Sequence, residues 1–197
     1  MRKTRMIITR HCETDNNAKR IYSGIQDVDL NAKGEMQASA LGRAIAGIDN
    51  CRAGTVWTSI LIRSLRTGNL ISFQTGSRVI QEAKFGEVDI GKMAGLTKGT
   101  AHERFPEECY RTSSDGFDFT QIGGENADQV RKRYQDGFHR VHRDALASQE
   151  TVPVIVGHGT ALRLHFANPL TRFKLLLGEQ PGQLTQGSFC LIEYHDD

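Results

Sequence analysis

Residues 6–15 contain an apolar run that ends abruptly in a basic residue and a histidine. Four apolar or β-branched residues (6–9) are typical of a buried strand, and Arg10 and His11 follow them directly, ahead of a polar turn. In an open α/β sheet, ligands bind beyond the carboxyl ends of the strands. A guanidinium and an imidazole at that place favour an anion, for which a phosphate is the simplest candidate. The stretch also fits a strand that merely ends in surface polar residues, so the rest of the chain must decide.

The composition is that of a soluble globular domain. The chain has 197 residues, 38% apolar and 24% charged, which is enough for one domain with a real core. Its net charge of +2 is too small to indicate a nucleic-acid or membrane surface, and no apolar run approaches a membrane span. The four cysteines are far apart and form no C-x-x-C pair, so we expect free thiols and a cytoplasmic location. A homodimer is allowed but is not indicated.

Segments typical of strands and helices alternate along the chain. Strands are expected at residues 5–9, 55–58, 79–80, 152–156 and 188–194, and helices at 31–48, 61–73, 128–147 and 160–167. Asn31 and Asp128 are the expected N-caps of two of these helices. Residues 13–29 are expected to form a long loop, and residues from about 86 to 124 a glycine-rich cap of loops and short helices. The alternation predicts a single α/β domain over residues 1–197, with a mostly parallel central sheet flanked by helices on both faces.

Two of the expected strands lead into histidines. One ends before His11 and the other before His158, and parallel strands place their carboxyl ends at the same edge of a sheet. If the strand at residues 55–58 is parallel too, Arg63 lies in the first turn of the helix that leaves this edge. Arg10, Arg63 and the two imidazoles would then surround one point. This arrangement predicts a site for a dianion, because a planar guanidinium can bind two phosphate oxygens at once.

Four segments of the chain resemble motifs of the histidine phosphatase superfamily, the phosphoglycerate-mutase-like group whose branch 1 has an R-H-G motif. Residues 9–15 (TRHCETD) look like its R-H-G-E-T, and residues 59–67 (SILIRSLRT) are similar to its S-x-L-x-R-A-x-x-T. Residues 123–126 (GGEN) resemble G-G-E-S, and residues 154–163 (VIVGHGTALR) resemble V-x-V-S-H-G-G-x-x-R. Because all four occur in the family's order, the chain is identified as a member of the superfamily. The resemblance implies a three-layer, phosphoglycerate-mutase-like fold.

The resemblance also implies a phosphohistidine mechanism. His11 would attack phosphorus, while Arg10, Arg63 and His158 would hold the phosphoryl oxygens and offset their charge. A glutamate would give a proton to the leaving alkoxide and then act as the base toward the water that hydrolyses the phosphohistidine. No cofactor and no metal ion is implied, because the guanidiniums supply the positive charge.

Two glutamates are candidates for this proton donor. The family pattern E-x-x-x-G-x-W-E-G-L-T fits from Glu87 without a gap, and the fit continues through residues 103–106. From Glu82, only the first five positions match before an insertion is needed. We therefore assign the role to Glu87 and interpret Glu82 as a solvated surface carboxylate, while keeping Glu82 as the alternative.

The resemblance assigns further residues to the substrate. Asn17 stands where the family has a phosphate-contacting asparagine, and Ser23 and Gly24 match a loop on the substrate side, although turn chemistry is the alternative for each. The full expected substrate-binding set is Arg10, Asn17, Ser23, Gly24, Arg63, His158 and Gly159. Lys92, Lys98, Arg104 and Arg111 could contact the remainder of an anionic substrate, but each also fits an ordinary surface charge.

Cys12 departs from the family pattern, which has a glycine after the nucleophilic histidine. A side chain there would crowd the turn if φ were positive or if the backbone approached the phosphate. Beside cationic groups, its thiol is also expected to ionise more readily. The change puts the substrate and the rate in doubt more than the class of reaction.

The sequence favours a phosphomonoesterase that acts on a small phosphorylated metabolite, without nucleic-acid or membrane partners. A phosphoglycerate mutase is one alternative, but the mutases are longer and carry paired arginines in an insertion before the second histidine. Residues 95–124 are short and lack such a pair. A non-catalytic member that binds phosphorylated ligands or proteins is the other alternative, which Cys12 keeps open. The sequence does not identify the substrate.

Overall fold

The computed structural model describes residues 3–111, 116–148 and 151–195. Within them lies a six-stranded sheet in the order β3-β2-β4-β1-β6-β5. Its strands are β1 (Lys3–Arg10), β2 (Ala53–Thr58), β3 (Val79–Gln81), β4 (Val152–Gly157), β5 (Arg172–Gly178) and β6 (Phe189–His195). The first four are mutually parallel, whereas β6 is antiparallel to both of its neighbours, β1 and β5. The predicted α/β fold with a mostly parallel sheet is therefore confirmed.

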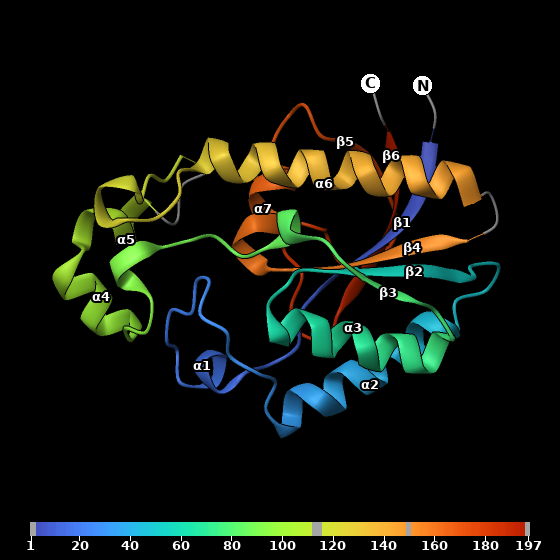
Figure 1. Cartoon of the computed structure of the whole chain (residues 1–197), viewed down its shortest axis with the longest axis horizontal. Helices are drawn as coiled ribbons and strands as arrows, with labels where there is room; N and C mark the ends of the chain where they lie inside the picture. Colours follow the sequence, from blue (N-terminus) through green and yellow to red (C-terminus); the bar gives the residue numbers. More distant parts are fainter. Residues whose placement is uncertain (1–2, 112–115, 149–150, 196–197) are drawn as a thin grey trace.

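Helices cover both faces of the sheet, as Figure 1 shows. α2 (Ala32–Ala46) and α3 (Ile62–Thr75) lie on one face, and α6 (Ala127–Ser148) and α7 (Gly159–Ala167) lie on the other. The fully buried side chains of β1 serve both layers: Met6 and Ile8 belong to the core under α6 and α7, and Ile7 to the core under α2 and α3. A strand buried on both faces needs an uninterrupted apolar run, which explains the sequence at residues 6–8.

Two of the helices show how local sequence fixes their starts. Asn31 caps α2 as predicted, because its side chain accepts a hydrogen bond of 2.8 Å from the Gly34 amide. α6 is capped by Asn126 rather than by the predicted Asp128. Asn126 and Gln129 each accept a bond of 2.9 Å from the other's amide, which forms a reciprocal capping box. Asp128 lies in the first turn instead, where a carboxylate still favours the helix dipole.

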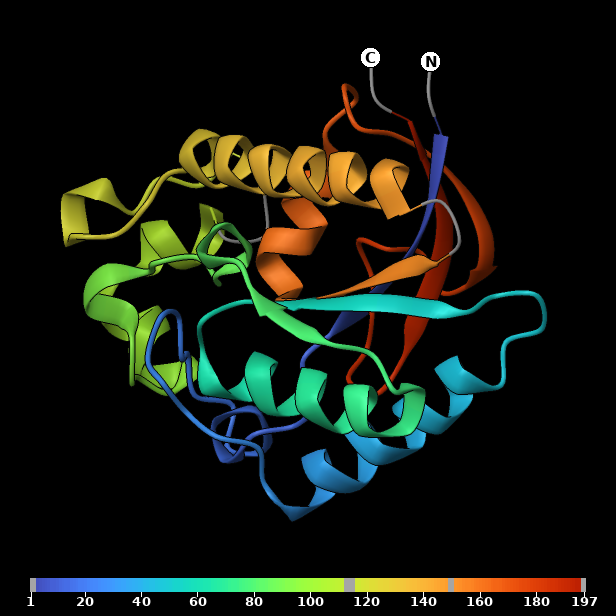
Figure 2. The same ribbon diagram turned by 45° about the vertical axis from the view of Figure 1, so that its right-hand side comes forward.

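The order of connections creates a crevice at one end of the sheet. β1 and β4 are neighbours, but the chain leaves β1 toward the α2 face and leaves β4 toward the α7 face (Figure 2). Such a reversal opens a crevice beyond the carboxyl ends of the two strands. His11 and His158 follow these two strands directly.

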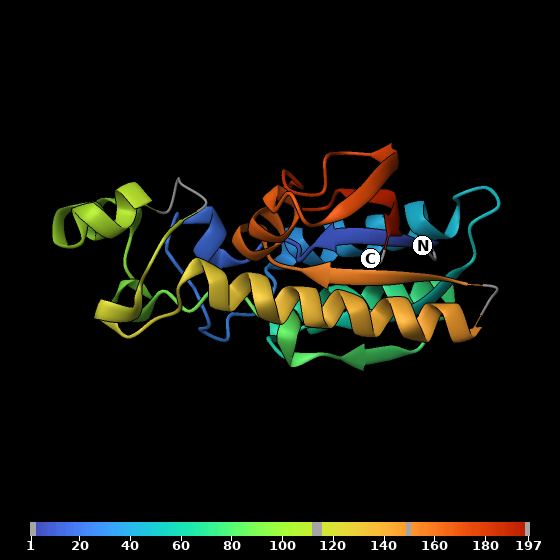
Figure 3. The ribbon, with the colours of Figure 1, turned by 90° about the horizontal axis from the view of Figure 1, so that it is seen from above.

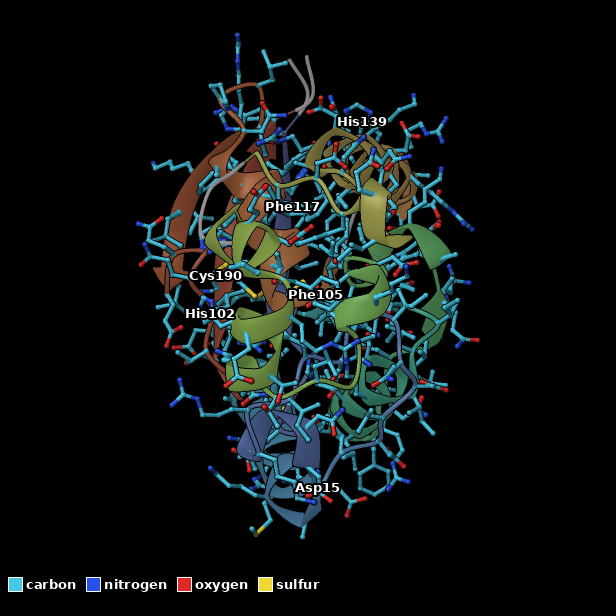
Figure 4. The ribbon with its side chains drawn as sticks, turned by 90° about the vertical axis from the view of Figure 1, so that its left-hand side faces the viewer. Asp15, His102, Phe105, Phe117, His139 and Cys190 are labelled. Carbon is cyan, nitrogen blue, oxygen red and sulfur yellow. The ribbon has the colours of Figure 1, made fainter. Side chains whose placement is uncertain are left out.

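A cap of short elements covers this end of the sheet (Figure 3). It contains α4 (Lys98–Arg104), α5 (Pro106–Arg111) and the 3-10 turns η2 (Gly91–Met93) and η3 (Thr120–Ile122), whereas the 3-10 turn η1 (Ala83–Phe85) precedes it and packs against α6. Figure 4 looks onto this end, with His102 and Phe105 on the cap and Asp15 below them. The cap is anchored because Phe117 and Phe119 stack on each other and are buried in the core that α6 and α7 share.

Two elements were not predicted. The four-residue helix α1 (Asp15–Ala18) interrupts the expected loop at residues 13–29, because Thr14 and Asn17 form a capping box. β5 was not predicted; it is an edge strand without a buried residue, and its pairing with β6 shifts register between Leu175 and Leu177. None of the described helices is long and apolar enough to cross a membrane.

The close packing of α3 on β2 predicts a cost for enlarging Gly68. A Cβ atom at this position would lie 2.3 Å from Cγ2 of Thr58. We expect Gly68→Ala to lower the free energy of unfolding in urea by about 1–3 kcal/mol, although alanine is the better helix former by about 1 kcal/mol. Asn69→Ala, on the exposed side of the same turn, is the control and should change it by less than about 0.5 kcal/mol. Equal stability of the two variants would contradict this packing.

Candidate active site

His11 lies at the carboxyl end of β1 with only 3% of its surface exposed. Its amide donates to the Gly157 carbonyl at 3.0 Å, which continues the β1–β4 pairing by one residue. Its Nδ1 lies 2.8 Å from the Cys12 carbonyl. A carbonyl can only accept, so Nδ1 carries the proton and Nε2 keeps its lone pair. Burial, together with the charges of Arg63 and Arg10, holds the pKa of His11 well below its usual value.

His158 lies beside His11, at the end of β4. The two ring centroids are 5.1 Å apart, and His158 is fully buried. Its Nε2 lies 2.7 Å from Oγ of Ser59, whereas its Nδ1 has no hydrogen-bond partner among the described residues. Burial is the main cause that holds its pKa well below the usual value, and Arg63 adds to the effect. The lowered pKa values favour the neutral form of both imidazoles at pH 7, and a neutral imidazole keeps one nitrogen lone pair.

Two arginines flank the histidine pair. Arg63 lies in the first turn of α3, is 2% exposed, and donates to the carbonyls of Gly24 and Gln26 at 2.7 Å each. Arg10 has a buried Nε without a hydrogen-bond partner, and it passes close to Gly159, where a Cβ atom would lie 3.0 Å from its Cζ. Burial lowers the pKa of both guanidiniums, and the negative charge of Glu87 opposes that effect. Arg63 thus also fixes the loop that follows α1.

The two candidate proton donors lie in different places. Glu87 lines the same cavity as Arg10 and His11, and its Oε1 accepts bonds from the amides of Val88 at 3.0 Å and Ala161 at 3.3 Å. Glu82 does not line this cavity. The interpretation of Glu82 as a solvated carboxylate was wrong. Only 5% of its surface is exposed. Its carboxylate accepts a hydrogen bond of 2.6 Å from Arg140 and one of 3.1 Å from the Lys84 amide.

These side chains surround a cavity of about 320 Å³. Its lining includes the predicted residues Arg10, His11, Asn17, Ser23, Gly24, Arg63 and Glu87, and further residues Asn16, Arg20, Ile21, Tyr22, Val88, Ile90, Lys98, Phe119, Thr160 and Gln186. Glu87 is the one carboxylate among these described lining residues, against several cations. The geometry thus provides a positively charged pocket around a neutral imidazole, which suits a phosphate dianion.

The substrate-side residues also make local contacts. Asn17 Oδ1 accepts from the amide of Thr14 at 3.1 Å and from the side chain of Gln186 at 2.6 Å, so it has the turn chemistry considered for it while it lines the cavity. Ser23 Oγ accepts from the side chain of Asn16 at 3.1 Å. Gly24 has a φ of +50°, which favours glycine, and a Cβ there would meet Ile90.

A second cavity of about 700 Å³ continues from the first. Both are lined by Arg10, Tyr22, Glu87, Lys98 and Thr160, and the second adds His102, Gly159 and Arg163 among others. Lys98 is therefore placed to contact a substrate, whereas Lys92 and Arg104 line neither cavity. The side chain of Arg111 lies outside the described residues. No group of three or more metal-ligating side chains converges in the described part of the chain.

Ser59 and Gln186 are site residues that sequence reasoning missed. Ser59 directly follows β2, so the argument from strand ends applied to it, but serine carries no charge to draw attention. Gln186 precedes β6. Because β6 is antiparallel to β1, its amino end meets the carboxyl end of β1, and nothing local in the sequence indicated that direction.

Cys12 differs from both expectations for it. Its φ is not positive, its side chain is fully buried in the core under α2 and α3, and it does not line the cavity. Burial raises the pKa of its thiol to about 11, although a hydrogen bond with Thr67 opposes the rise. The expected ionised thiol beside the cations was therefore wrong, because the side chain points into the core and away from them.

Comparison with known proteins agrees with this geometry. The family model of the histidine phosphatase superfamily (branch 1) matches residues 6–197. A 2,3-bisphosphoglycerate-dependent phosphoglycerate mutase of Rhizobium meliloti (strain 1021) is 29% identical over 80% of this chain and 75% of its own length. The mutase of the same name from Bartonella bacilliformis is 28% identical over 83% and 79%. The structure of mycobacterial glucosyl-3-phosphoglycerate phosphatase in complex with VO3 is similar in fold, with a TM-score of 0.71 and 20% identity over 88% of this chain and 92% of that one.

The position of Cys12 predicts that its side chain is not needed for activity. We expect Cys12→Ala to change kcat by less than about threefold, which is under 1 kcal/mol. The same variant should lower the free energy of unfolding by about 1–2 kcal/mol, because it leaves a small cavity in the core. Steady-state kinetics and urea unfolding check the two effects separately. A large loss of kcat at unchanged stability would show that the thiol acts in the pocket.

Buried histidines predict a loss of stability in acid. His165 is 2% exposed and stacks on Phe138, and burial lowers its pKa to about 3. Below its ordinary pKa of about 6.5, the unfolded chain binds a proton that the native chain refuses, so stability falls as pH falls. Each such histidine contributes a slope of about 1.4 kcal/mol per pH unit.

His165→Phe should therefore make the free energy of unfolding less dependent on pH between about pH 5 and pH 6. Urea titrations across this range measure the slope, and His102→Gln, at an exposed position, is the control. An unchanged slope in His165→Phe would mean that this imidazole is protonated in the native chain.

Proposed function

Because the chain belongs to the histidine phosphatase superfamily (branch 1), we propose that it is a phosphomonoesterase that works through a phosphohistidine on His11. One observation carries the proposal. His11, whose Nε2 is unprotonated, lines a cavity together with Arg10, Arg63 and Glu87, and the buried ring of His158 lies beside that of His11, with centroids 5.1 Å apart. A metaphosphate-like transition state needs such positioning and little else.

The roles follow from the contacts. His11 Nε2 attacks phosphorus, and the bond to the leaving oxygen breaks, while the proton stays on Nδ1 and its hydrogen bond to the Cys12 carbonyl is kept. In this proposal, Ser59 donates to Nε2 of His158, and the Nδ1 of His158, which has no hydrogen-bond partner among the described residues, donates to a phosphoryl oxygen. Glu87 gives its proton to the leaving alkoxide, then takes one from the water that attacks the phosphohistidine. These steps use no metal ion or cofactor.

The second cavity supports a substrate larger than phosphate itself. Its lining includes Lys98, His102 and Arg163, which favour a polar or anionic leaving group. We therefore propose a small phosphorylated metabolite as the substrate, in a protein without nucleic-acid or membrane partners. The names of the curated relatives keep phosphoglycerate mutase activity as the second candidate.

The proposal predicts a hierarchy of defects. His11→Ala should lower phosphate release by more than about 10⁴-fold, since the covalent route is lost. Glu87→Gln should lower it by about 10²–10⁴-fold, the usual value of a general acid–base group. Phosphate release from a panel of phosphorylated metabolites, with and without chelator, measures both variants, and Glu82→Gln is the matched control that should keep most of the activity.

The alternatives give different results in the same assay. Interconversion of phosphoglycerates that requires a bisphosphate primer would identify a mutase instead. Turnover that survives His11→Ala, or that chelator abolishes, would refute the mechanism. If wild-type protein binds the metabolites without releasing phosphate from any of them, it is a non-catalytic member.

A further inference from the structure

Arg133 of α6 contacts the segment that carries Glu87. Its Nε and Nη2 donate to the two carboxylate oxygens of Glu125 at 2.9 Å each. Its Nη1 donates to the carbonyls of Lys84 at 2.9 Å and Gly86 at 2.7 Å, and its Nη2 donates to the carbonyl of Glu87 at 3.0 Å. A guanidinium has five N–H groups in a rigid fork, and here the fork makes five hydrogen bonds.

Glu125 ties the other side of the same segment. Its carboxylate accepts a bond of 3.0 Å from the Asp89 amide, and its own amide donates to the Asp89 carbonyl at 2.8 Å. The backbone is thus fixed on both sides of Glu87, at residues 84, 86 and 87 by Arg133 and at residue 89 by Glu125. Tyr134, the next residue of α6, adds a bond of 2.9 Å to the Phe85 carbonyl.

The hydrogen bonds of Arg133 and Glu125 to residues 84–89, which we call the clamp, hold a segment around Glu87 that has no regular secondary structure. Residues 86–90 belong to no helix or strand, whereas His11 and His158 directly follow β1 and β4, and Arg63 lies in α3. Among the described residues, the Glu87 side chain itself accepts only from the amides of Val88 and Ala161. The place of its carboxyl group in the cavity therefore depends on where the backbone is held. A misplacement of about 1 Å in a catalytic group can cost about 100-fold in rate.

We propose that Arg133 is the positioning residue for the proton donor, and that Glu125 holds the guanidinium in the orientation this requires. The inference rests on the proposed role of Glu87. It assigns to α6, which lies outside the cavity lining, a function in two chemical steps that use the same carboxyl group: departure of the leaving group and hydrolysis of the phosphohistidine.

Arg140 provides a matched control on the same helix. It also joins α6 to the connection after β3, because it donates to Glu82 at 2.6 Å and lies 5.1 Å from the centroid of the Trp57 ring. It is more exposed than Arg133, at 45% against 20% of the side chain, and it contacts neither Glu87 nor the cavity lining. Loss of an α6 ion pair can therefore be separated from loss of the clamp.

The experiment compares two leaving groups. A nitrophenolate leaves without a proton, whereas the alkoxide of an alkyl phosphate needs one, so only the second depends on a placed acid. We expect Arg133→Lys, which keeps the charge but not the fork, to lower kcat/KM for the alkyl phosphate by about 10–100-fold and for p-nitrophenyl phosphate by less than about threefold. Nitrophenolate should also appear as a burst, because phosphohistidine hydrolysis is slowed. Arg140→Lys should lower both values alike and only slightly.

Glu87→Gln separates failure of this inference from failure of the proposed function. If Glu87→Gln lacks the leaving-group dependence, the role of Glu87 is wrong. If Glu87→Gln shows it but Arg133→Lys lowers both substrates equally, Arg133 is only structural and the inference is overturned. Glu125→Gln, which leaves the backbone bonds of Arg133 in place, should give a weaker form of the same dependence, and it tests the clamp if Arg133→Lys fails to fold. Arg133→Lys added to Glu87→Gln should cause no further loss for the alkyl phosphate.

Discussion

The hydrogen bond between the His11 amide and the Gly157 carbonyl is the contact on which the site depends. It extends the parallel pairing of β1 and β4 by one residue beyond the last strand residue of β1, so the two histidines that follow these strands lie side by side. The chain then leaves the two strands toward opposite faces, which opens the crevice between them. Registers of parallel strands are rigid, so the distance between the imidazoles is set by the sheet rather than by a loop.

This arrangement buries groups that need an anion. Arg10 Nε and His158 Nδ1 are buried without hydrogen-bond partners among the described residues, and an unmade bond to a buried donor costs about 1–3 kcal/mol. In the proposed mechanism, a bound phosphoryl group accepts a hydrogen bond from each. The same burial keeps the two imidazoles neutral, so the pocket holds its positive charge in the arginines and its lone pair on His11. The arginines can therefore bind an anion while His11 keeps its lone pair, so the two functions rest on different side chains.

The sequence predicted the site residues that lie at strand ends and helix starts, but it did not predict the contacts of residues that depend on distant parts of the chain. Apolar runs that stop at Arg10 and before His158 predicted the sheet edge, and the first turn of the next helix predicted Arg63, because strand ends and helix starts are local patterns. The environment of Cys12 was predicted wrongly, because its side chain points toward α2 and α3, and the sequence beside Cys12 does not show on which face of the sheet these helices lie. Glu82 was taken as solvated because its partner, Arg140, is 58 residues away along the chain.

The assignment of Asn126 rather than Asp128 as the start of α6 has a related cause. Either residue type can cap a helix, and the reciprocal bond from Gln129 decides between them. The four-residue stretch GGEN that resembles the family motif thus ends in a helix cap and contains Glu125, one residue before it. A pattern matched from the family identified the stretch, but only the fold relates it to Glu87, through Arg133.

The histidines and Arg63 are consequently held in place in a different way from Glu87. His11, His158 and Arg63 lie at strand ends and at a helix start, which resist displacement because they are part of the core. Glu87 lies on an irregular segment between the sheet and the cap, held by side-chain hydrogen bonds from α6. In the proposed mechanism, changes in the cap would therefore alter proton transfer to the leaving group and leave the phosphate pocket intact. The cap also lines the second cavity through Lys98 and His102, so in the same proposal it would contact the leaving group that Glu87 protonates.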